Sequence, residues 1–119
     1  MEQQNYTDKP TLAAWNELAQ AAESIPQIVT GTYAGNNMDT RTITLGFQPK
    51  ALLIFRANGC TSNEKGAWGG LALPGYPVTT DAGNSIEITS TGFLLRYSND
   101  SGYVPRANGP ATFYYIALR

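Results

Sequence analysis

Residues 42–55 read TITLGFQPKALLIF and contain the clearest secondary-structure pattern in the chain. Ile43, Leu45 and Phe47 alternate with small or polar residues, which is the period-two pattern of a strand with one buried face. Pro49 fixes its own φ near about −65° and has no N–H to donate, so residues 48–50 are predicted to form a corner. Residues 51–55 are nearly all apolar, as in a strand that is covered on both faces. This stretch therefore predicts a strand, a corner and a deeply buried strand.

Length and charge limit the classes of protein to consider. The chain has 119 residues, of which 14% are charged, with 12 glycines and 7 prolines, as expected of one compact, turn-rich β protein. The net charge is −1, which gives no basic field for nucleic acid. No apolar run approaches the roughly 20 residues that span a bilayer, and the N-terminus shows no signal-peptide pattern. We therefore expect a soluble chain with no export signal, no membrane insertion and no nucleic-acid partner.

Residues suited to catalysis or metal binding are scarce. Cys60 is the only cysteine and the chain has no histidine, which removes internal disulfides, cysteine-rich zinc sites, the usual general base and the ordinary catalytic triads. The carboxylates of residues 27–119 are not adjacent to one another, so nothing in the sequence selects a glycosidase pair. We expect no enzymatic activity, no metal and no cofactor.

A helix is predicted before the β region. Residues 11–23 have helix-forming composition, Thr7 or Asp8 can cap the first turn, and Pro26 pushes the preceding residue out of the helical region. An apolar stripe recurs at three- and four-residue steps. It consists of Leu12, Trp15, Ala19 and Ala22, with Leu18 at its edge.

The stripe has two interpretations, because an isolated helix of this length is marginal in water. Either it packs on its own β domain, or it meets copies of itself in a homotrimer beneath a β head. The second interpretation divides the chain into a lead-in and helical oligomerisation stalk, residues 1–26, and a β head, residues 27–119.

Turn signals come at short intervals after residue 26, and the segments between them favour strands. We predict strands near residues 27–34, 40–47, 50–57, 67–73, 84–89, 92–98 and 111–118. The last of these should be central and buried on both faces. The expected fold is mainly β, an antiparallel β-sandwich of about 6–7 strands preceded by one N-terminal α-helix. The segment Arg-Ala-Asn-Gly occurs at residues 56–59 and again at 106–109, and we interpret both copies as turns.

Two regions offer side chains for a ligand. Residues 97–106 read YSNDSGYVPR and combine aromatic rings with donors and acceptors for hydroxyl groups, although an ordinary polar hairpin loop has similar composition. Trp68 lies among three glycines and fits either a flat platform for a sugar or a buried ring. The candidate ligand-binding residues are Trp68, Tyr97, Asn99, Asp100, Tyr103 and Arg106.

Several motifs in order resemble a known class of β module. They are GTYAG at residues 31–35, ITLGFQPKA at 43–51, GF at 92–93, and NG at 108–109 leading to YYIA at 114–117. This pattern resembles the small C-terminal β modules of phage and prophage tail-fibre or receptor-binding proteins. The order of a Phe-x-Pro corner, a buried strand, a Gly-Phe strand and an aromatic-Ile-Ala last strand is also similar to H-type lectin domains. The resemblance covers most of residues 29–118.

The resemblance implies a function in host attachment. It implies a homotrimeric, non-enzymatic fibre tip that is made in the bacterial cytoplasm and becomes part of the virion tail. Such a tip binds a bacterial surface glycan through loops of the head and joins other tail-fibre or baseplate proteins. No sugar-contacting residue is carried over, because the lectin-site loop residues have no match here position by position. The alternative is a structural trimerisation or capping module with no ligand of its own.

Overall fold

The computed structural model describes residues 27–119, which are mainly β. The predicted helix and its stripe (Leu12, Trp15, Leu18, Ala19 and Ala22) lie outside the described residues. Within residues 27–119 no helix is long and apolar enough to cross a membrane. The strands are β1 (Ile28–Ala34), β2 (Thr40–Thr44), β3 (Ala51–Arg56), β4 (Ser62–Asn63), β5 (Gly66–Ala67), β6 (Gly70–Ala72), β7 (Val78–Thr80), β8 (Gly83–Thr89), β9 (Gly92–Arg96), β10 (Val104–Pro105) and β11 (Thr112–Leu118).

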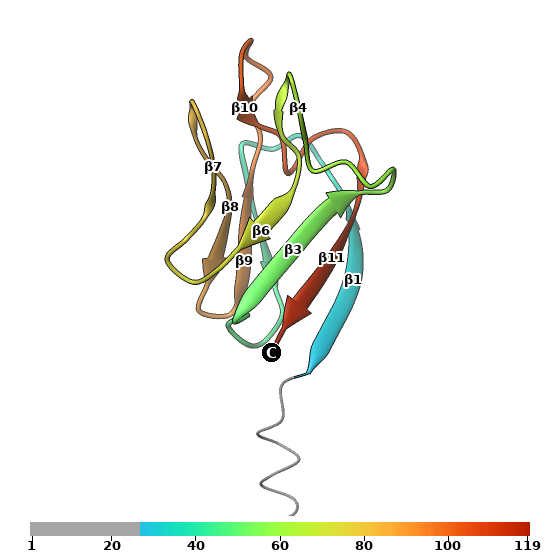
Figure 1. Ribbon diagram of the computed structural model, residues 1–119, viewed down its shortest axis with the longest axis vertical. Coiled ribbons are helices and arrows are strands. Elements are labelled where there is room, and N and C mark those ends of the chain that lie inside the picture. The colour runs from blue at the N-terminus through green and yellow to red at the C-terminus, as the bar shows by residue number, and fades with distance from the viewer. Residues whose placement is uncertain (1–26) are drawn as a thin grey trace, which may run out of the picture.

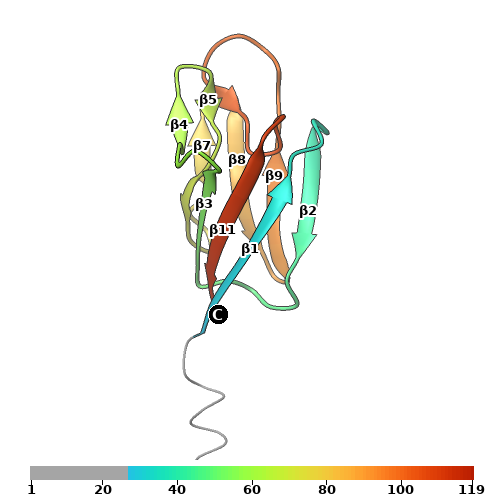
Figure 2. The same cartoon turned by 90° about the vertical axis from the view of Figure 1, so that its right-hand side faces the viewer.

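Two four-stranded antiparallel sheets form the body of the head. The β1 sheet has the order β1-β11-β3-β6, and the β2 sheet has the order β2-β9-β8-β7. Figure 2 shows the two sheets as separate layers, with β1 and β11 in one and β2 and β9 in the other. A small third sheet, β10-β5-β4, lies at the upper end and contains the one parallel pair among the described strands, β10 with β5.

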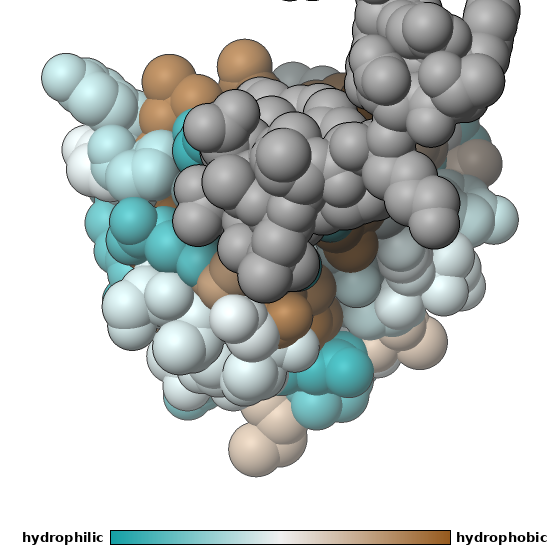
Figure 3. All heavy atoms as spheres, turned by 90° about the horizontal axis from the view of Figure 1, so that it is seen from below, coloured by the Kyte–Doolittle hydropathy of each residue, from teal (hydrophilic) through white to brown (hydrophobic). Residues whose placement is uncertain are grey.

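The chain enters and leaves the head at the same end. The Arg119 N–H donates to the Gln27 carbonyl oxygen at 2.8 Å, and both lie at the lower end in Figure 1. Seen from that end, hydrophobic residues reach the surface between hydrophilic ones (Figure 3). The β1–β2 loop and the β9–β10 loop lie at the opposite, upper end.

The core lies between the two sheets and is filled from both. Tyr33 of β1 stacks on Phe113 of β11 with ring centroids 4.9 Å apart, and Phe93 of β9 meets Tyr115 of β11 edge-on at 5.3 Å. Such aromatic pairs add to the burial of apolar area. The fully buried hydrophobic side chains include Leu52, Ile54 and Phe113 from the β1 sheet and Ile86, Phe93 and Leu95 from the β2 sheet.

The predicted corner is confirmed, although the strand before it is shorter than predicted. β2 ends at Thr44, because the N–H groups of Leu45 and Gly46 both donate to the Thr91 carbonyl, at 2.7 and 3.0 Å, instead of continuing the ladder. Gly46 has φ +86°, a conformation that favours glycine. Pro49 is fully buried at the corner, which leads directly into β3.

The prediction that β3 and β11 are buried on both faces is wrong. In β3, Leu52 and Ile54 are fully buried, whereas Leu53 is only half-buried. β11 is central in its sheet, as predicted, but Tyr114 is 41% exposed and Ile116 is 38% exposed. A strand with an exposed apolar face has the same apolar sequence as a strand that is buried on both faces. Composition therefore could not show whether the second face of β3 or β11 is buried.

Other boundaries also differ from the sequence prediction. The strand predicted at 67–73 divides into β5 and β6, because a Cβ at Gly69 would lie 2.1 Å from the Ile54 carbonyl oxygen and Gly70 has φ +136°. The strand predicted at 92–98 ends at Arg96. Both Arg-Ala-Asn-Gly segments are turns, as predicted: the glycine N–H donates to the arginine carbonyl at 2.7 Å in 56–59 and at 2.9 Å in 106–109.

Candidate functional site

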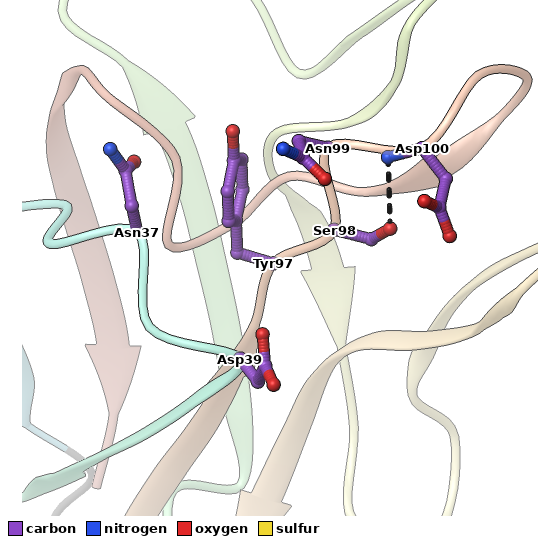
Figure 4. Close-up of a pocket in the computed structure, with 6 residues that line it drawn as sticks. All are labelled: Asn37, Asp39, Tyr97, Ser98, Asn99 and Asp100. Carbon is purple, nitrogen blue, oxygen red and sulfur yellow. Dashed lines mark hydrogen bonds between the residues drawn. The ribbon is translucent and has the colours of Figure 1, made fainter.

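A polar pocket of about 440 Å³ lies at the loop end of the head. Two loops supply its walls: the β1–β2 loop and the first residues of the β9–β10 loop (Figure 4). The lining residues are Asn37, Asp39, Tyr97, Ser98, Asn99 and Asp100. The pocket therefore contains three of the six residues predicted for ligand binding, namely Tyr97, Asn99 and Asp100.

Backbone hydrogen bonds hold the two loops against each other. The Tyr97 N–H donates to the Asp39 carbonyl at 3.1 Å, which continues the β2–β9 pairing beyond the last residue of β9. The Ser98 N–H donates to the Pro105 carbonyl at 2.9 Å, so the β9–β10 loop closes on itself. These bonds fix where Tyr97 leaves the sheet and place it beside Asp39.

Asn108 fixes the β1–β2 loop from inside the protein. Its side chain is fully buried, and its Nδ2 donates to Asn36 Oδ1 at 2.6 Å and to the Met38 carbonyl at 3.0 Å. Its carbonyl oxygen accepts the Asn37 N–H at 2.9 Å. Asn37 has φ +62°, a left-handed conformation that asparagine tolerates better than most residues. Asn108 thus acts as a positioning residue for Asn37.

The Tyr97 ring stands between the side chains of Asn37 and Asn99 in Figure 4. The Arg106 guanidinium carbon lies 5.8 Å from the Tyr97 ring centroid. The backbone of Gly109 packs against the same ring, because a Cβ built at Gly109 would lie 3.3 Å from it. Tyr97 is therefore a ring held in place at a polar surface, not a freely rotating side chain.

Arg106 and Tyr103 do not line the pocket. Arg106 donates from Nε to the Lys65 carbonyl at 3.1 Å and from Nη2 to the Asp100 carbonyl at 3.0 Å, so it fixes the loop that carries Asp100. Tyr103 is half-buried, and its carbonyl accepts the Asp81 N–H at 3.2 Å. Of these two candidates, Arg106 supports the pocket and Tyr103 lies farther along the loop.

Trp68 belongs to the core instead of offering a platform. It is 6% exposed, and its indole N–H donates to Asn63 Oδ1 at 3.0 Å. The Arg56 guanidinium carbon lies 4.2 Å from the ring centroid, and Phe113 stacks at 6.4 Å. Because these neighbours occupy the surroundings of the ring, the buried interpretation holds, and we exclude Trp68 from the candidate site.

The chemistry of the pocket is that of hydrogen bonding to hydroxyl groups. Asp39 and Asp100 accept, the amides of Asn37 and Asn99 donate and accept, and the Tyr97 ring offers an apolar surface. The lining includes two carboxylates and no cationic side chain, which disfavours anionic ligands. Within residues 27–119 no group of three or more His, Cys, Asp or Glu side chains lies close enough to hold a metal ion.

Asn37, Asp39 and Ser98 were not among the predicted ligand-binding residues, and the supporting role of Asn108 was not predicted either. Residues 35–37 read Gly-Asn-Asn, which is typical of a turn, and the positive φ of Asn37 agrees with that. The nearness of the β1–β2 loop to residues 97–100 depends on the β2–β9 pairing, in which Thr40 lies opposite Arg96. This nearness could have been predicted from the sequence only by predicting that β2 pairs with β9.

The chain matches no protein-family model, no curated protein and no solved structure.

Proposed function

We propose that this protein is a homotrimeric phage tail-fibre tip or receptor-binding module that recognises a bacterial surface glycan and catalyses no reaction. Residues 27–119 form a β-sandwich head, and residues 1–26 form a helical stalk that joins three copies. Other tail-fibre or baseplate proteins hold the stalk in the virion tail. The observation that supports recognition is the polar pocket of Asn37, Asp39 and residues 97–100. The two loops that supply it lie at the end of the head opposite the C-terminus.

The ligand class follows from the lining of the pocket. A pyranose ring has an apolar face that packs on an aromatic ring and hydroxyl groups that bond to carboxylate and amide groups, all of which are present here. Two carboxylates without a lining cation repel phosphate and carboxylate groups. The proposal is therefore a neutral glycan, and its binding should depend little on salt because no net ion pairing is involved.

The test is binding of the full chain to a glycan array and to bacterial cells. Tyr97→Ala should weaken binding about tenfold or more, because aromatic contacts in the centre of a site carry much of the binding energy. Tyr76→Ala is the matched control: Tyr76 is 73% exposed and lies outside the pocket, so its removal should leave binding unchanged. Equal binding by both variants would place recognition elsewhere on the head.

Other outcomes separate the alternatives. If the wild-type chain binds no glycan and no host cell, the structural capping module is favoured; the apolar outward face of the β1 sheet already supports self-assembly without a ligand. If the chain shortens a surface polysaccharide, and Asp39→Asn or Asp100→Asn abolishes that turnover, the pocket is an active site and the non-enzymatic proposal fails.

A further inference from the structure

The outward face of the β1 sheet is apolar and has no charged side chain. Register and burial place alternate residues of β1, β11, β3 and β6 on this face, while their neighbours point into the core. The outward residues define what we call the β1-sheet face. They are Ile28, Thr30, Thr32, Ala34, Ala51, Leu53, Phe55, Leu71, Thr112, Tyr114, Ile116 and Leu118.

Large hydrophobic side chains on this face are open to solvent. Ile28 is 72% exposed, Leu71 62%, Tyr114 41% and Ile116 38%. Phe55 and Tyr114 lie side by side with ring centroids 5.8 Å apart. A shallow apolar depression of about 280 Å³ lies in the middle of the face, lined by residues that include Thr30, Thr32, Phe55, Tyr114 and Ile116. Contiguous exposed apolar surface of this kind marks interaction sites.

The opposite face of the head, on the β2 sheet, has a different character. Its outward side chains include Thr42 in β2 and the ion pair between Arg96 Nη2 and Glu87 Oε2, 3.2 Å apart, which joins β9 to β8. These side chains are hydrophilic, as expected of a face that is exposed to solvent. Only one of the two outer faces is therefore apolar, although both belong to four-stranded sheets of similar size.

The size of the β1-sheet face limits what it can bind alone. Four strands about 4.8 Å apart and about 20 Å long cover roughly 400 Å². A specific, stable interface buries about 800 Å² of accessible surface on each partner, so a contact limited to this face is at the small end of specific interfaces.

We propose that the β1-sheet face is the contact surface between copies of this chain, arranged around a three-fold axis. The inference rests on the homotrimer of the proposed function and names the surface that it uses. Residues 1–26 precede Gln27, and the next residue, Ile28, is itself on the face and highly exposed. If residues 1–26 join three copies, as proposed above, Ile28 and the face to which it belongs lie next to the three-fold axis. Three copies of the face then meet at the axis, and each covers part of its neighbours.

The test is the mass of the full chain in solution at micromolar concentration, by light scattering or sedimentation. Ile28→Lys and Ile116→Lys each place a charge on the β1-sheet face, which is costly to bury in an interface. Thr42→Lys is the matched control, an exposed position on an outward strand face of the β2 sheet. The wild-type chain and Thr42→Lys should be trimers, and the two face variants should be monomers that keep the dispersed NMR signals of the folded β head.

Two results would overturn the inference, and they are distinguishable. A wild-type monomer removes the trimer from the proposed function and the interface with it. Face variants that remain trimers place the interface elsewhere and leave the proposed function intact. Glycan binding is measured separately, and a monomeric face variant should retain binding of a soluble monovalent sugar, because neither Ile28 nor Ile116 lines the pocket. If Ile116→Lys fails to fold, Ile28→Lys decides, since Ile28 is already 72% exposed.

Discussion

Leu53 and Ile54 are adjacent in the sequence and have opposite environments. Ile54 is fully buried between the sheets, whereas Leu53 points outward and is half-buried. We expect Ile54→Ala to lower the free energy of unfolding by about 2–5 kcal/mol, and Leu53→Ala by about 1 kcal/mol, because truncation creates a cavity only inside the core. Urea denaturation in the Ile28→Lys background measures both without a contribution from association. Equal losses of unfolding free energy in the two variants would contradict the assignment of Ile54 to the core and Leu53 to the outward face.

Tyr33 makes the stability of the head sensitive to alkaline pH. Burial raises its pKa well above the usual value, opposed by the nearby Arg41 guanidinium, and its hydroxyl donates to the Ala107 carbonyl at 2.8 Å. The folded state therefore retains a proton that the unfolded state releases above pH about 10. The stability contributed by this proton is fully present below pH about 10 and falls above it, by up to about 1.4 kcal/mol per pH unit.

Tyr33→Phe should remove this part of the alkaline sensitivity, at a cost of about 1 kcal/mol near neutral pH for the lost hydrogen bond. The measurement is the free energy of unfolding between pH 8 and 11.5, roughly spanning the tyrosine range. Tyr76→Phe is the matched control, because that side chain is 73% exposed. If the wild-type chain and Tyr33→Phe lose stability in parallel at high pH, the phenol of Tyr33 is not the group responsible.

At the level of elements, the β1–β2 loop depends on one buried side chain. Asn108→Ala leaves Asn36 Oδ1 and the Met38 carbonyl without their buried partner, which should lower stability by about 1–3 kcal/mol. The loop that carries Asn37 should loosen, with faster amide hydrogen exchange at residues 36–38 and weaker glycan binding. Asn58→Ala is the matched control in the other Arg-Ala-Asn-Gly turn, where the asparagine is exposed. Similar effects of the two substitutions would exclude the positioning role of Asn108.

The elements that the sequence predicted well are those whose pattern is local. The β8–β9 hairpin follows from Ile86 and Ile88 before Thr91-Gly92 and from Phe93 and Leu95 after it, and it is found with Ile88 opposite Phe93. The short strands β4, β7 and β10 were not predicted, because two or three residues have no periodicity to detect. The antiparallel, mainly β class is confirmed because turns and alternation repeat along the chain.

The site was only half predictable for a similar reason. Residues 97–100 are contiguous, and their composition alone suggested a binding loop. Asn37 and Asp39 come from a loop some sixty residues earlier and meet Tyr97 only through sheet pairing. Trp68 was ambiguous in sequence because glycines surround both exposed and buried tryptophans, and only the packing of Arg56 and Phe113 on the ring decides between them.

For the whole molecule, association through the β1-sheet face should make thermal stability depend on protein concentration. Unfolding of a trimer releases three chains, so a tenfold increase in concentration should raise the melting temperature by roughly 4–7 °C for a domain of this size. The Ile28→Lys variant, as a monomer, should melt at the same temperature at both concentrations. A wild-type melting temperature that does not change with concentration would contradict the assembly.

The hydrogen bond between the Arg119 N–H and the Gln27 carbonyl brings both ends of the head together, away from the pocket. Residues 27–119 can therefore be fused to other proteins as a unit. Another stalk, a fluorescent protein or a surface linker can be fused at either end without obstructing residues 97–100. If the pocket binds a cell-surface glycan as proposed, exchange of the two loops around it should alter which cells are bound, while the sheets and the attachment point stay the same.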